Sequence, residues 1–138
     1  MKRNVILFTL FMITFAGVSQ AATTTGTVSI HNNTFMQYVV NTTGSLAFEF
    51  CPAIPVVLLE TRFTLSASGG AGNFTATLDN GTTSTLDVNM RTVDMTSASS
   101  VHWIPVNPII LKASDVMDFA YPNANLKTYG LEVVYRRL

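Results

Sequence analysis

The chain has 138 residues, of which 48% are hydrophobic and only 12% are charged, and eight Lys and Arg balance eight Asp and Glu. This length suits one domain with one core. A basic stripe is the electrostatic footprint of nucleic-acid binding, and its absence argues against nucleic acid as a partner.

The first 21 residues have the pattern of a secretory signal peptide. Lys2 and Arg3 form a short basic region, Val5–Val18 is apolar, and Ser19-Gln20-Ala21 is a small-x-small cleavage site. The apolar run is shorter than the ~20 residues of a membrane span, and an uncleaved anchor is the alternative. We therefore expect a signal peptide over residues 1–21.

The mature chain then forms one domain over residues 22–138. We expect it to be secreted, periplasmic or on the cell surface, with no membrane contact after cleavage of the signal peptide. Ala22–Thr25 is short, polar and terminal, so we expect a loose leader there.

The rest of the chain shows a two-residue period. Apolar and polar residues alternate in six runs, and one buried face with one wet face is typical of antiparallel sheets. The alternating apolar sets are Leu46, Phe48 and Phe50; Phe63, Leu65 and Ala67; Phe74, Ala76 and Leu78; Leu86, Val88 and Met90; Met117, Phe119 and Tyr121; and Leu131, Val133 and Tyr135.

Turn signals separate these runs. Asn80-Gly81 suits the positive φ angles of a type I′ turn, and it predicts a hairpin between the third and fourth runs. Pro105, Pro108 and Pro122 mark strand ends or edges. About eight to ten short strands at this spacing predict an all-β fold, either a single antiparallel β-sandwich or a barrel.

Leu111–Leu138 predicts a closing hairpin. Its alternation points Met117, Phe119, Leu131, Val133 and Tyr135 inward and turns Asp118 and Glu132 toward water or a partner subunit.

Several stretches from about Thr61 onward carry a family resemblance. They are Trp103-Ile104-Pro105 before a Pro-Ile-Ile-Leu strand, a Ser-Asp turn before a strand that ends in Pro122-Asn123, and the strand Tyr129–Val133. In this order of features the chain resembles small jelly-roll-like β-sandwich modules of bacteriophage virions and prophage-encoded structural proteins. The resemblance implies a jelly-roll-like sandwich and a structural role, and none of its motifs is catalytic.

Oxygen-bearing side chains near the C-terminus are the candidates for a metal site. Asp115, Asp118, Asn123 and Asn125 are close in sequence and offer ligands that suit calcium. The favoured interpretation is that Asp115 tightens a turn while Asn123 and Asn125 shape the loop before Tyr129, since short polar side chains bond local backbone in turns. We therefore expect no metal and no cofactor.

Three aromatic residues are the candidates for a sugar-binding platform, namely Trp103, Tyr121 and Tyr129. Trp103 alternates with Val101, so we expect it to fill the core. Tyr121 and Tyr129 flank the loop at 122–128 and are the better candidates for an exposed pair.

The single cysteine, Cys51, lies among apolar neighbours in FEFCPAIP. We expect a buried, unpaired thiol. The alternative is an interchain disulfide, which an oxidising location permits.

Catalysis finds little support in the sequence. His31 and His102 are distant from each other, G-x-S-x-G is absent, and the acidic residues fall in turns or on wet strand faces. We expect a secreted, non-enzymatic structural or interaction subunit that self-assembles or decorates a larger particle or surface, with copies of itself or other structural proteins as partners. The alternative is a carbohydrate-binding module for a surface glycan, and a hydrolytic enzyme comes third.

Overall fold

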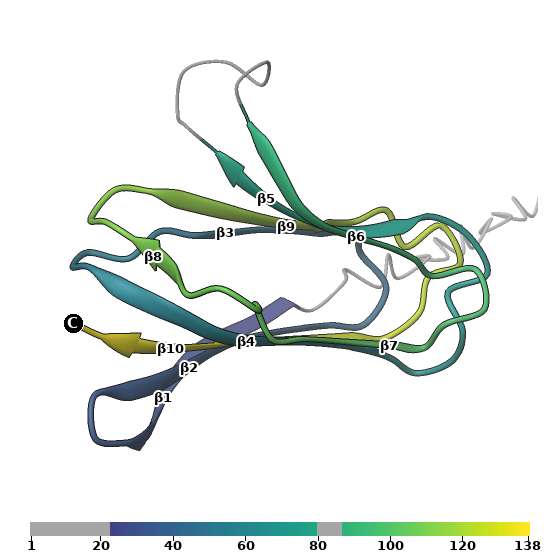
Figure 1. Ribbon diagram of the computed structural model, residues 1–138. Coiled ribbons are helices and arrows are strands. Elements are labelled where there is room, and N and C mark those ends of the chain that lie inside the picture. The colour runs from purple at the N-terminus through teal and green to yellow at the C-terminus, as the bar shows by residue number, and fades with distance from the viewer. Residues whose placement is uncertain (1–22, 80–86) are drawn as a thin grey trace, which may run out of the picture.

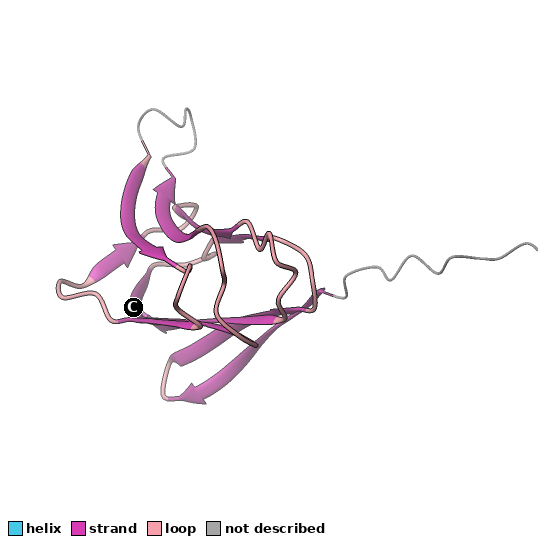
Figure 2. Ribbon diagram, turned by 90° about the vertical axis from the view of Figure 1, so that its right-hand side faces the viewer, coloured by secondary structure: helices cyan, strands magenta, loops and turns pink. Residues whose placement is uncertain are grey.

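A computed structural model describes residues 23–79 and 87–138, and this part of the chain contains strands and loops but no helix (Figure 2). Ten strands form two antiparallel sheets that face each other (Figure 1). The strands are β1 (Thr23–His31), β2 (Thr34–Asn41), β3 (Leu46–Phe50), β4 (Val56–Leu65), β5 (Asn73–Asp79), β6 (Val88–Asp94), β7 (Ser100–Trp103), β8 (Ile109–Leu111), β9 (Val116–Tyr121) and β10 (Tyr129–Arg137).

The strand order is that of a jelly roll. Sheet A runs β1-β2-β10-β4-β7, with β8 also paired to β4, and sheet B runs β3-β9-β5-β6. The ladders β2–β10, β3–β9, β4–β7/β8 and β5–β6 are successive segments of one rolled-up antiparallel ribbon. This wrapping gives the two Greek keys of a jelly roll. The predicted all-β sandwich is therefore confirmed, with β1 as an addition at one edge.

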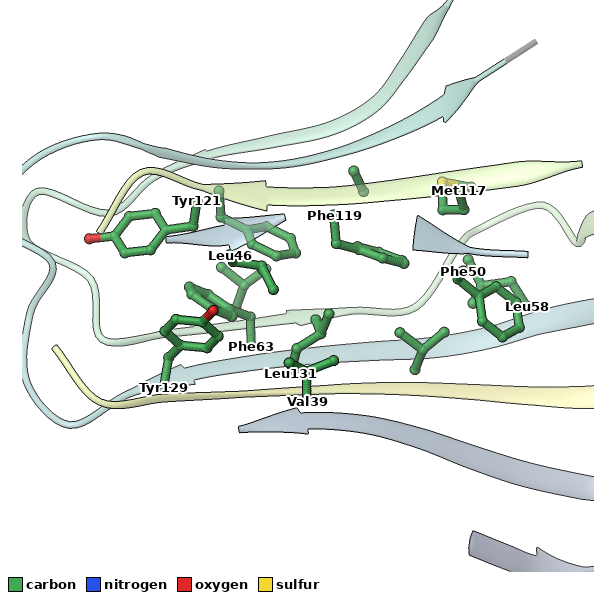
Figure 3. Close-up of a cluster of buried hydrophobic side chains, with 14 of the residues drawn as sticks. Val39, Leu46, Phe50, Leu58, Phe63, Met117, Phe119, Tyr121, Tyr129 and Leu131 are labelled. Carbon is green, nitrogen blue, oxygen red and sulfur yellow. The ribbon is translucent and has the colours of Figure 1, made fainter. Parts of the chain in front are cut away.

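The core lies between the two sheets and is built by the alternation seen in the sequence. Side chains from both sheets meet there (Figure 3). The rings of Phe63 in β4 and Phe74 in β5, for example, have centroids 4.8 Å apart. The residues predicted to point inward from the last two strands are all buried: Met117, Phe119, Leu131, Val133 and Tyr135. Pro105, Pro108 and Pro122 all lie just outside strands, as predicted.

The predicted closing hairpin is wrong. Strand β9 pairs with β3 and β5 in sheet B, whereas β10 lies between β2 and β4 in sheet A. Residues 122–128 therefore connect one sheet to the other. Alternation assigns each strand a buried face, but it does not distinguish a strand paired alongside from one stacked across the core.

The N-terminal segment is also more ordered than predicted. Thr23–Thr25, which were expected to belong to a loose leader, instead lie in strand β1, which pairs with β2 along almost its whole length. Asn32 and Asn33 connect the two strands with φ angles of 32° and 55°. Positive φ at both central residues is what a two-residue type I′ turn requires, and Asn tolerates it well.

The β5–β6 ladder places Leu78 opposite Val88, so the two runs around Asn80-Gly81 do pair. The predicted turn itself and Leu86 lie outside the described residues. Val88 was predicted to be inward, yet it is 52% exposed. Figure 1 gives the reason, because this end of the hairpin lifts away from the opposite sheet.

Candidate functional site

A shallow hollow lies on the outer face of sheet B, over β3 and β9. The rings of Phe48 and Phe119 point toward the core, so the residues on either side of each of them along β3 and β9 face outward. Ala47 lies opposite Ala120, and these short side chains leave space above the strands. The result is a hollow of about 450 Å³, lined by Ala47, Phe48, Glu49, Asp118, Phe119 and Ala120.

Glu49 and Asp118 supply the polar groups of this hollow and lie directly opposite each other across the β3–β9 ladder. Burial raises the pKa of Asp118, and the negative charges of Asp79, Glu49 and Asp87 raise it further. Among the described residues, the Asp118 Oδ1 atom is buried without a hydrogen-bond donor. The raised pKa therefore follows from poor solvation and like-charge repulsion.

A carboxyl with a raised pKa beside a second carboxyl is an arrangement that acid–base catalysts use. The other lining residues are alanine and phenylalanine, which offer neither a nucleophilic side chain nor a donor to hold a substrate. Within residues 23–79 and 87–138, no group of three or more His, Cys, Asp and Glu is placed to hold a metal ion.

The four calcium candidates do not form one site. Asp115 lies before β9 and Asn123 lies after it, and six extended residues span roughly 20 Å. Asp118 faces outward between them, and Asp115 accepts a hydrogen bond from Lys112 N at 2.8 Å. Asn125 instead donates to Gly69 O at 2.7 Å. As predicted, Asp115 tightens its turn and the asparagines shape their loop.

Tyr121 and Tyr129 are not an exposed pair, so this prediction is wrong. They are 1% and 3% exposed, and their hydroxyls donate to Ala71 O at 3.2 Å and Ser45 O at 2.9 Å. Burial raises the pKa of both phenols. Both residues fall on the inward-facing positions of the alternating pattern in their strands, and the adjoining loop does not change which way they point.

Trp103 ends β7 and is half-buried against the core. Trp103 was expected to fill the core, but its side chain is only partly buried there. It also lines a surface hollow of about 340 Å³ together with Met90, Pro105, Val106, Asn107, Pro108 and Ile109.

The edge of sheet A is interrupted beside this tryptophan. Strand β7 pairs with Thr61–Thr64 and β8 pairs with Val56–Leu58, toward opposite ends of β4 (Figure 1). Pro105 and Pro108 have no N–H to donate, so the segment between the two strands leaves the ladder.

Large aliphatic side chains are exposed in and next to this interruption. Ile104 is 60% exposed, Val106 is 98% exposed, and Ile110 in β8 is 58% exposed. We call these three residues the apolar ridge. The sequence did not predict the ridge, because Ile104 and Val106 lie between strands, where apolar alternation gives no information.

The outer face of sheet A carries a network of charged residues. His102 Nε2 lies 2.6 Å from Glu60 Oε1, which also accepts from Arg62 Nε, and Arg62 reaches Glu132 at 3.5 Å. The hydrogen bond from Arg62 lowers the pKa of Glu60. His102 faces outward, and its side chain is 59% exposed. Such exposed pairs contribute little to stability, and no serine or cysteine lies in the network.

Cys51 is exposed rather than buried, which corrects the expectation. Leu46 and Phe50 point inward at the two ends of β3, so the next residue along the chain turns outward. The alternation of β3 therefore predicts the exposure of Cys51 better than its apolar neighbours in the sequence do.

Comparison with known proteins adds little to this description. No family model and no curated protein matches the chain. A solved structure from Ralstonia eutropha JMP134, provisionally described as a mannose-6-phosphate isomerase, is similar with a TM-score of 0.39 and 9% identity, over 96% of this chain and 100% of that chain. At this identity and TM-score, no function passes from that protein to this chain.

No helix in the described part of the chain has the length and apolarity to cross a membrane.

Proposed function

We propose that the chain is a secreted, non-enzymatic structural or interaction subunit that self-assembles or decorates a larger particle or surface. The observation that carries this proposal is the apolar ridge, where three aliphatic side chains are each more than half exposed within a few residues. Exposed clusters of large apolar residues mark interaction sites in soluble proteins.

The use of polar side chains supports a non-catalytic role. Asn123 is 1% exposed and bonds the backbone of two loops, and Asn41 is 4% exposed and accepts from Thr43 N and Gly44 N. These groups hold the fold, and they do not converge on an open cleft. The signal-peptide pattern supports export, and the resemblance to jelly-roll modules of bacteriophage virions supports a structural role.

Light scattering over a range of concentrations tests this proposal. We expect the purified protein to form a defined assembly, and we expect Val106→Asp to reduce its mass because a charge on the ridge opposes burial. Leu126→Asp is the matched control, since Leu126 is 66% exposed in a distant loop at a φ of 51°, which Asp tolerates. An assembly that is unaffected by Val106→Asp would contradict a role for the ridge.

A carbohydrate-binding module is the second candidate, and Trp103 is the observation that favours it. The half-buried ring and Asn107 line the same surface hollow, and an aromatic face beside an amide suits a sugar. Glycan-array binding that is lost in Trp103→Ala and kept in Leu126→Asp would support this candidate over the first.

A further inference from the structure

Strand β1 presents a long, open sheet edge. Eight of its nine residues are exposed, and its ladder is with β2 alone. The hairpin lies at the end of sheet A, with no strand of sheet A on the far side of β1 (Figure 1). The backbone N–H and C=O groups on that side can therefore accept another strand.

The other sheet edges in the described chain are protected. Strand β3 has only five residues and includes Glu49. Strand β6 carries Arg91 and Asp94 and has an irregular register with β5. Strands β7 and β8 are short and separated by prolines. Charges, irregular register, prolines and short length are the devices that prevent edge-to-edge pairing.

Strand β1 has only one of these devices, an irregular register between Ser29 and His31 at its hairpin end, and Thr23–Ser29 pair regularly with β2. Its sequence, TTTGTVSIH, contains no Asp, Glu, Lys, Arg or Pro. It is rich in Thr, Val and Ile, which favour extended backbone. Val28 and Ile30 are 46% and 53% exposed on it.

We propose that β1 pairs antiparallel with β1 of a second copy of the chain, about a two-fold axis near Thr27. The proposal rests on the proposed role as an assembling subunit and identifies the partner and the surface. It joins sheet A of both copies into one continuous sheet.

The strand is complementary to itself in this register. Thr27 lies opposite Thr27 of the second copy, and Thr25 lies opposite Ser29, so hydroxyl-bearing pairs line one face. Ile30 lies at the register irregularity of β1, where the regular part of the strand ends.

Val28 lies opposite Gly26 of the second copy. The ring of Tyr38 lies over Gly26. If residue 26 had a side chain, its Cβ would lie only 2.7 Å from Cζ of this ring. Val28 therefore meets an aromatic surface. Pairing places a neighbouring strand beside Val28 and brings no like charges together.

A second copy fits this edge better than an unrelated extended peptide. One two-fold pairing satisfies the open edges of both molecules at once, and the assembly closes as a dimer. A single peptide strand added to β1 would leave its own outer edge open.

The test places a charge at the two-fold axis. It uses the whole chain carrying Val106→Asp, so that contacts through the apolar ridge do not contribute. We expect this protein to be a dimer by light scattering and sedimentation. Adding Thr27→Lys should halve the mass, because two lysines then face each other, and Thr27→Glu should do the same.

Mixing the Thr27→Lys and Thr27→Glu proteins should restore the dimer through an opposite-charge pair. This rescue also shows that both variants are folded. Thr92→Lys is the matched control, since Thr92 is an exposed residue on the edge strand β6. It should leave the dimer intact.

The possible outcomes separate the two proposals. A Val106→Asp protein that is already monomeric overturns β1 pairing but leaves the assembling role in place. A dimer that survives Thr27→Lys, or a mixture that stays monomeric, also overturns β1 pairing. An unmutated chain that is monomeric at every concentration contradicts both proposals.

Discussion

Asn123 shows how one buried amide can hold several segments of a fold. Its Nδ2 donates to Thr43 O at 3.2 Å, Gly44 O at 2.8 Å and Lys127 O at 2.8 Å, while its Oδ1 accepts from Lys127 N. Its φ of 49° is also one that Asn adopts more readily than most residues. The loop between the two sheets is thus tied to the β2–β3 connection by this side chain.

Replacing Asn123 with Ala should lower the free energy of unfolding by about 1–3 kcal/mol, because buried carbonyls lose their donor. Urea unfolding measures the change. Asn107→Ala, at an exposed loop position, is the control and should lie within about 0.5 kcal/mol of the parent. Equal effects of the two substitutions would show that the Asn123 bonds do not stabilise the fold.

Asp118 should give a pH-dependent effect. Because its pKa is raised in the folded protein, the folded state keeps this proton to a higher pH than the unfolded chain does. Stability therefore falls as the pH rises from the ordinary Asp value of 3.8 through the raised value. Asp118→Asn should raise the melting temperature at pH 7, and this gain should disappear as the pH falls toward 4.

Asp94→Asn is a control for which the expected change in melting temperature at pH 7 has the opposite sign. Hydrogen bonds from the Thr96 hydroxyl and backbone N–H lower the pKa of Asp94, so its contribution is present at neutral pH and is lost in acid. This variant should therefore melt lower at pH 7. A gain at pH 7 from both substitutions would point to a general effect of net charge rather than to the local repulsion around Asp118.

At the scale of elements, the sequence predicted strands best where one face is buried. Alternation correctly predicted β3, β5, β9 and β10, because each has a clear inward set of residues. It predicted only the last four residues of β4, and Ala67, which was expected to point inward, lies beyond that strand and is exposed. It did not predict β1, since a strand exposed on both faces has no apolar period. It also paired β9 with β10 wrongly, because pairing depends on contacts between segments distant in sequence.

The positions of strands in the sheet predict which truncations the fold tolerates. Strand β10 lies between β2 and β4, and it supplies the buried residues Leu131 and Val133. Deleting residues 131–138 should therefore prevent folding, whereas deleting residues 22–31 removes only an edge strand and should leave a folded sandwich. Circular dichroism and resistance to protease distinguish the two outcomes. A folded protein without residues 131–138 would contradict the central place of β10.

At the scale of the molecule, the candidate surfaces were harder to predict than the fold. The hollow over β3 and β9 depends on Glu49 meeting Asp118 through a ladder between distant segments. The apolar ridge depends on where the edge strand breaks. Tyr121 and Tyr129 continue the inward-facing positions of β9 and β10, so alternation alone predicts that both are buried.

The whole sandwich depends on aromatic contacts between its sheets, and Phe119 tests them. Phe119 is 0% exposed in sheet B, and it stacks with Phe48 and Phe74 at centroid distances of 6.4 and 6.3 Å. Phe74 in turn contacts Phe63 of the opposite sheet. Truncating Phe119 therefore leaves a cavity beside the residues that join the two layers.

Phe119→Ala should lower the free energy of unfolding by about 3–5 kcal/mol, as for other fully buried aromatic residues. Phe35→Ala is the matched control, since Phe35 is only half-buried and stacks on Tyr135 at 5.8 Å near the end of the sandwich. Its loss should cost less, because less apolar surface returns to water. Chemical unfolding of both variants gives the comparison. If the two substitutions cost the same, the core around Phe119 would not be the main contact between the sheets, and the stability would have to come from the strand ladders.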